Sequence, residues 1–150
     1  MLPKAILPAT SSEGGNIPPV DRAYTALLMT VRSLIQALTD WCEKKVDEDY
    51  VLEIMDTIEG EYKATKEALD VYEIDMSEFD SIPTSLRNVV EKCVYETQAP
   101  GTLEIYLPNV QVLVQQLMIG LMDRQVVYKG ILIEAPELAW AAGTKVQTNS

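Results

Sequence analysis

The chain contains no histidine among its 150 residues. This absence excludes histidine acid–base catalysis, Ser-His and Cys-His nucleophile pairs, and histidine-rich metal sites. Cys42 and Cys93 are the only cysteines, and they have neither the CxxC spacing of a metal knuckle nor the number that a secreted disulfide scaffold needs. We therefore expect reduced, partly buried thiols in a cytoplasmic protein.

Basic residues are scarce, above all in residues 40–80. The formal net charge is −11, and this window holds 15 of the 23 acids but only four of the 12 bases. Such a surface repels nucleic-acid phosphates and anionic lipid heads. The remaining interpretations are a contact for a basic protein partner or a plain solvated face.

Catalytic and cofactor motifs are also missing. The carboxylates crowd one predicted helix, and no spacing suggests the two acids of a glycosidase cleft. Asp75, Ser77 and Asp80 lack the calcium-loop spacing, and Gly14-Gly15 lacks the Lys-Ser/Thr ending of a phosphate loop. We predict no catalytic residue, no metal and no cofactor, and conclude that the chain is not an enzyme.

Between Ile105 and Met122 there is no charged residue, although Gln and one Pro interrupt the apolar run. The run is shorter and more polar than a typical membrane span, so we expect no direct membrane insertion. A helix that is apolar around most of its circumference is central in a bundle or covered by a partner. Both interpretations stay open: a central bundle helix, or a seam for a second protomer or a partner helix. The candidate partner-binding residues are Val112, Gln115, Gln116, Met118, Ile119 and Met122.

The apolar periodicity predicts an all-α fold, an antiparallel bundle of four main helices with short extra turns near Ser77 and Thr102. Asp47 is a suitable N-cap for the second helix, and Pro108 is expected to open the fourth. We expect the first and fourth helices to be the most buried. The predicted helices span residues 21–43, 47–72, 83–96 and 109–129.

Three regions are expected. Residues 1–19, rich in Pro, Gly and Ser, predict a flexible leader without the pattern of a signal peptide. Residues 20–130 form the helical bundle interaction domain. Residues 131–150 lose the periodicity and predict a weakly ordered tail.

Three segments carry a family resemblance, in the family's order and spacing. They are TALLMTVRSLIQALTDW (Thr25–Trp41), IDMSEFDSIPTSLRNVVEKCV (Ile74–Val94) and YLPNVQVLVQQLMIGL (Tyr106–Leu121). From Val20 to about Gln125 the chain resembles the N-terminal domain of the fungal bud-site-selection protein six family, also called actin-interacting protein three. The resemblance covers about two-thirds of the chain.

This resemblance implies a non-enzymatic scaffold or adaptor domain of a cell-polarity factor, in the cytoplasm and cytoskeleton. Family members act with the polarisome at the cell cortex, the growing tip and the division neck, where they support actin cable assembly and microtubule capture. The implied partners are polarisome and microtubule-end proteins, and a homodimer is a further candidate. The alternative is a purely structural helical module whose activity resides in a C-terminal region outside this chain.

Overall fold

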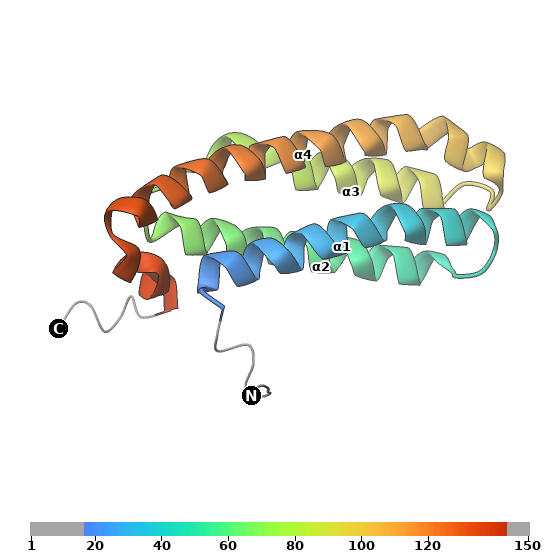
Figure 1. The fold of residues 1–150 in the computed structure, drawn as a ribbon. Coiled ribbons are helices and arrows are strands. Elements are labelled where there is room, and N and C mark those ends of the chain that lie inside the picture. The colour runs from blue at the N-terminus through green and yellow to red at the C-terminus, as the bar shows by residue number, and fades with distance from the viewer. Residues whose placement is uncertain (1–16, 144–150) are drawn as a thin grey trace, which may run out of the picture.

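The computed structural model describes residues 17–143 (Figure 1). This part of the chain contains helices and no strand, so the expectation of an all-α fold with four main helices is confirmed. The short turn predicted near Ser77 is present as a 3-10 helix. The elements are α1 (Pro19–Cys42), α2 (Glu48–Asp70), η2 (Ser77–Phe79), α3 (Ser81–Val94), α4 (Pro100–Glu134) and η3 (Pro136–Gly143).

The four helices pack side by side as two hairpins. Figure 1 shows α1 running from left to right, α2 returning, α3 running to the right again and α4 returning above it. The closest associations are between α1 and α2 and between α3 and α4, and contacts of α1 with α4 and of α2 with α3 close the bundle. Short connections between neighbouring helices produce this arrangement.

The core sits between the inner faces of the helices. Along α1 the buried side chains recur at three- and four-residue steps, as the sequence pattern predicts. Trp41 is only 2% exposed and ends this stripe as an anchor. Removing these side chains from water provides the main driving force for folding. The stripe on α1 comprises Val20, Tyr24, Leu27, Val31, Leu34, Ala37, Leu38, Trp41 and Cys42.

Local signals fix the starts of the first two helices. Pro18 and Pro19 precede the first intrahelical hydrogen bonds, and Pro19 occupies the first turn of α1, where the missing N–H would have no partner anyway. The side chain of Asp47 accepts a hydrogen bond from the backbone N–H of Tyr50 at 3.0 Å, so the predicted N-cap of α2 is confirmed.

The start of the last helix was predicted incorrectly. We expected a separate turn at Thr102 and a new helix opened by Pro108, but α4 is continuous from Pro100 to Glu134 with Pro108 inside it. Pro108 has no N–H to donate to the preceding turn, which is a local cost. Burial of Leu103, which is 7% exposed, holds the first turns against the bundle and offsets that cost.

The structure also continues beyond the end of the periodic pattern. Helix α4 reaches Glu134, Ile131 and Leu132 pack partly against the core, and η3 follows. The hydroxyl of Tyr72 donates a hydrogen bond to the carbonyl of Leu138, which ties η3 to the end of α2. Most of the predicted leader (1–16) and the last part of the predicted tail (144–150) lie outside the described residues.

Candidate protein-contact site on helix α4

Helix α4 has two apolar sides that face in opposite directions. Its inner side enters the bundle core, where Leu103, Val110, Leu117, Leu121 and Tyr128 are buried. These residues follow the three- and four-residue steps of bundle packing. The prediction that α4 is among the most buried helices is therefore wrong: 6 of its 35 residues are buried, against 9 of 24 in α1, because much of its apolar surface faces away from the core.

The outer side of α4 carries a row of exposed β-branched residues, here called the outer stripe. It consists of Ile105 (70% exposed), Val112 (52%), Ile119 (59%), Val126 (71%) and Ile133 (81%). Each member follows the previous one by seven residues, which is nearly two helical turns, so the five form one continuous row along the helix surface. Met122, 61% exposed, lies three residues after Ile119 and widens the stripe.

Five of the six candidate partner-binding residues share this exposed side. Val112, Ile119 and Met122 are exposed apolar residues, and Gln115 and Gln116 are exposed amides among them. Met118 differs, because it is half-buried and packs against the core. The candidate list did not include Ile105, Val126 and Ile133, which belong to the outer stripe and whose seven-residue repeat is visible in the sequence.

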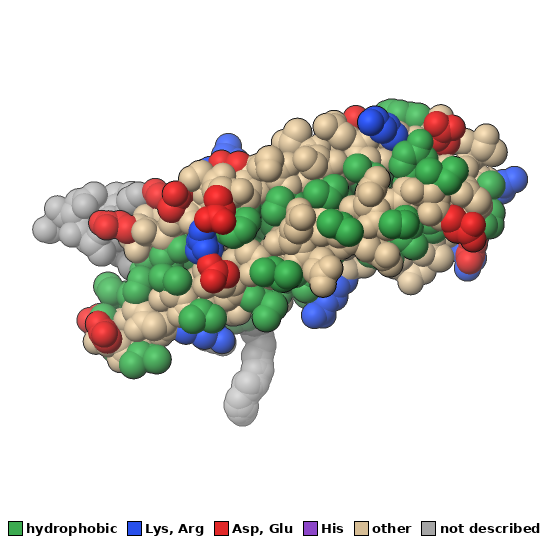
Figure 2. Space-filling model, turned by 90° about the horizontal axis from the view of Figure 1, so that it is seen from above, with side chains coloured by type: hydrophobic (Ala, Val, Ile, Leu, Met, Phe, Trp, Pro, Cys, Tyr) green, Lys and Arg blue, Asp and Glu red, His purple; other side chains and the backbone are tan. Residues whose placement is uncertain are grey.

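The middle of this face has few charges. Figure 2 views the molecule from the side on which α4 is uppermost in Figure 1, and red and blue side chains gather toward its two ends. Between them lie green apolar side chains and tan polar or backbone atoms. An apolar surface with a polar rim is the usual composition of a protein-contact site.

The position of α4 is fixed by polar contacts from its neighbours. The hydroxyl of Tyr24 in α1 donates to the carbonyl of Leu121 at 2.6 Å, and burial raises the pKa of this phenol. The guanidinium of Arg124 lies 4.8 Å from the centre of the Phe79 ring, and its Nε donates to the carbonyl of Asp75 at 2.8 Å. These contacts hold the inner side of α4 in place and thereby direct the outer stripe toward solvent.

Part of the acidic surface is neutralised by a base from a different helix. Arg87 of α3 contacts Glu59 of α2 through Nε (2.8 Å) and Nη2 (2.9 Å), and also pairs with Asp56 and Glu91. These carboxylates, Glu59 foremost, raise the pKa of Arg87. The acidic residues of α2 are therefore in part a structural contact between α2 and α3.

The described residues contain no group of three or more Asp, Glu or Cys side chains placed to hold a metal ion. An open groove lies beside the end of α2, and its lining includes Lys63, Lys66 and Asp70 together with apolar residues. Cys42 and Cys93 are buried free thiols, and burial raises the pKa of both, so neither has the low pKa of a nucleophilic cysteine.

By length and composition alone, α4 could cross a membrane, and it is the single such helix in the described part of the chain. The packing of α4 in the bundle argues against a membrane-spanning position. Its inner side is already buried against protein, and its exposed side carries Gln111, Gln115 and Gln116, whose amides would lack partners in lipid.

The described residues define the class of protein by its fold, a four-helix bundle whose last helix has an exposed apolar side. The particular family follows from comparison with known domains. Residues 21–129 match the model of the Aip3p/Bud6 N-terminal domain, so the chain belongs to this family, as the resemblance predicted. The family is one of polarity scaffolds and is not a known enzyme family. Comparisons with curated proteins and with solved structures gave no match.

Proposed function

We propose that this domain is a scaffold and adaptor of a cell-polarity factor, which recruits partner proteins to the cell cortex through the outer side of α4. The observation that carries the proposal is the outer stripe, five exposed β-branched side chains in a family of polarity scaffolds. Exposed apolar residues gathered in one patch mark a contact surface more often than exposed residues scattered singly.

The wider process we propose is actin cable assembly and capture of microtubule ends at growth and division sites. Family membership supports a role in polarity, and the domain supports it by its shape: a rigid bundle that presents one long helix. The partners we propose are polarisome and microtubule-end proteins. The domain itself would supply contact and position rather than chemistry.

The test is recruitment of the tagged full-length polarity factor in living cells. Ile119→Asp places a charge at the centre of the outer stripe, where the side chain is 59% exposed, so we expect the bundle to fold normally and cortical enrichment to fall. Met29→Asp is the matched control, since Met29 on α1 is also an exposed apolar residue, 62% exposed, outside α4. Unchanged cortical enrichment of the Ile119 variant would contradict the proposed surface.

A further inference from the structure

The exact spacing of the outer stripe contains information beyond its exposure. On a straight α-helix, residues seven positions apart are displaced from each other by about 20° around the helix axis, so a row of such residues winds slowly around the helix. The row keeps facing a neighbouring helix only if the two helices wrap around each other. Here the repeat holds through four intervals, from Ile105 to Ile133, without an exception. All five positions are Ile or Val, the β-branched residues that occupy the a position of parallel two-stranded coiled coils. The spacing therefore indicates that another helix lies along α4.

We propose that this helix is α4 of a second copy of the chain, packed antiparallel along the outer stripe. The inference rests on the proposed function only in treating the outer side of α4 as a contact surface. Two copies related by a two-fold axis would each present the same apolar line, as an isologous interface requires. The outer stripe of one copy therefore binds the outer stripe of the other.

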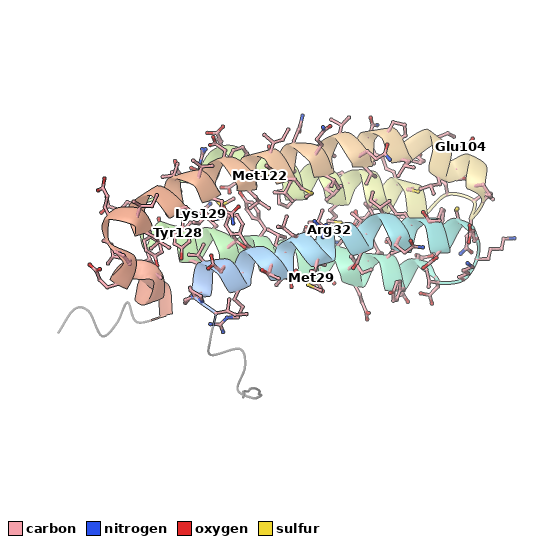
Figure 3. All side chains as sticks on the ribbon, viewed as in Figure 1. Met29, Arg32, Glu104, Met122, Tyr128 and Lys129 are labelled. Atoms are coloured by element: carbon pink, nitrogen blue, oxygen red, sulfur yellow. The ribbon has the colours of Figure 1, made fainter. Side chains whose placement is uncertain are left out.

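Charge decides the relative direction of the two helices. Glu104 and Lys129 lie toward opposite ends of α4, as Figure 3 shows, and both are exposed. Neither forms an ion pair with another described residue. In a parallel pair Lys129 would face Lys129 of the other copy, and like charges in register oppose pairing. In an antiparallel pair centred near Gln116, each Glu104 lies beside the other copy's Lys129.

The central residues fit the same register. With Ile105 level with Lys129, and Glu104 therefore next to it, Met122 of one copy lies level with Val112 of the other, and Ile119 lies level with Gln115. Apolar contacts thus alternate with amides that can donate to and accept from one another across the seam. No charged residue occurs between positions 105 and 122 to be desolvated in this overlap.

The overlap sets the strength expected of the dimer. From Ile105 to Lys129 the two helices would run together for about 36 Å, at 1.5 Å per residue. One helix face of this length is at the small end of specific interfaces, which bury about 800 Å² per partner. Three of the four d-type positions beside the stripe, Pro108, Gln115 and Lys129, are not the apolar residues of a tight coiled coil. We therefore expect a reversible dimer whose population rises with concentration.

The first experiment measures mass against concentration for the full 150-residue chain by sedimentation equilibrium. We expect a monomer–dimer equilibrium, and Ile119→Asp should raise the dissociation constant by roughly tenfold or more, because each dimer contains the substitution twice. Met29→Asp should leave it unchanged. Circular dichroism melts check that both variants fold. A monomer at every concentration, or equal effects of the two substitutions, would overturn the proposal.

The second experiment tests direction by reversing charges. Glu104→Lys and Lys129→Glu should each weaken the antiparallel dimer, and the double variant should restore it, because each single change creates two like-charge contacts and the double change removes them. In a parallel dimer neither single change creates a new repulsion, so two neutral single variants would overturn the antiparallel assignment. Raising the salt concentration should reduce the differences between the variants.

Two further experiments distinguish the dimer from lipid binding and from the proposed recruitment function. Vesicles of phosphatidylcholine and phosphatidylserine test whether lipid covers the stripe, and cosedimentation of a chain that stays monomeric would overturn the dimer.

Cortical enrichment is scored for the Lys129→Glu variant, which keeps the apolar stripe. Recruitment that survives loss of the dimer leaves the proposed function standing and removes self-association from it. Unchanged recruitment of the Ile119→Asp variant, with its dimer weakened as expected, contradicts the proposed function alone.

Discussion

The ring of Phe79 lies directly on Gly120, and a β-carbon at Gly120 would come within 2.7 Å of it. Phe79 ends the 3-10 helix between α2 and α3, and Gly120 lies in the middle of α4. Arg124, one turn further along α4, covers the same ring. A glycine at this position therefore allows the η2 segment to dock on α4, next to the helix whose other side carries the outer stripe.

Replacing Gly120 by alanine is expected to destabilise the domain by about 1–3 kcal/mol, the usual cost of overpacking a filled site. The matched control is Gly60→Ala in α2, where an added β-carbon meets nothing within 4 Å. That substitution should stabilise the helix by up to about 1 kcal/mol. Urea unfolding of both variants measures the difference. Stabilisation by both would show that Phe79 is free to move away.

The Arg87 cluster is expected to stabilise the contact between α2 and α3. Its side chain is 23% exposed and contacts Glu59 through two nitrogens, which is more favourable than a fully exposed ion pair. We expect Arg87→Met to lower the free energy of unfolding by about 1–2 kcal/mol, with a smaller loss in high salt.

The control for the Arg87 cluster is Lys45→Met, which removes an ion pair with Glu43 whose two side chains are 65% and 48% exposed. Exposed pairs of this kind contribute little, so no measurable change is expected. Both variants are compared by urea unfolding at low and high salt. Equal stability of the two variants would show that the cluster is only a surface feature.

Asp80 should give the domain a measurable sensitivity to acid. Its carboxylate accepts hydrogen bonds from Lys66 at 2.6 Å and from Tyr62 at 2.8 Å, and these lower its pKa. A carboxyl whose pKa is lower in the folded state stabilises it above the unfolded pKa, about 3.9. This contribution is lost as the pH falls through the folded value.

The measurement is urea unfolding as a function of pH, from neutral down to about pH 2, well below the pKa of an unperturbed aspartate. Asp80→Asn should be less stable than the parent at neutral pH and should approach it as the solution is acidified. Glu53→Gln removes an acid from the exposed side of α2 and serves as the control for net charge. A constant gap between Asp80→Asn and the parent at every pH would contradict the prediction.

The two cysteines should be slow to react in the native protein. Burial raises the pKa of Cys93 to about 11, with smaller effects from Cys42 and Glu96, and burial also raises the pKa of Cys42. The thiolate is the reactive form, so alkylation by iodoacetamide near pH 8 should be slow until urea unfolds the chain. Met29→Cys supplies an exposed thiol as reference. Equal rates for native and reference thiols would show that the core opens locally.

How much of the fold the sequence predicts depends on the helix. In α1 most apolar residues fall on one side, with Met29 an exposed exception, so their spacing identifies the buried stripe from Tyr24 to Trp41. Asp47 likewise caps α2 through a contact three residues away. Such features are local, because they depend on helix geometry and on neighbours within one turn.

Other features depended on tertiary packing. Helix α4 is apolar on two opposite sides, and its sequence cannot say which side enters the core, because both satisfy a helical repeat. Packing of α1, α3 and η2 makes that choice: Tyr24 binds the backbone at Leu121 and Phe79 covers Gly120. The same packing keeps α4 continuous across Pro108, although a proline by itself predicts the end of a helix. The sequence therefore determined an all-helical bundle in which one apolar helix has no charge between Ile105 and Met122. Only the tertiary structure decided which side of that helix is free to bind, since burial is a property of neighbours distant in the chain.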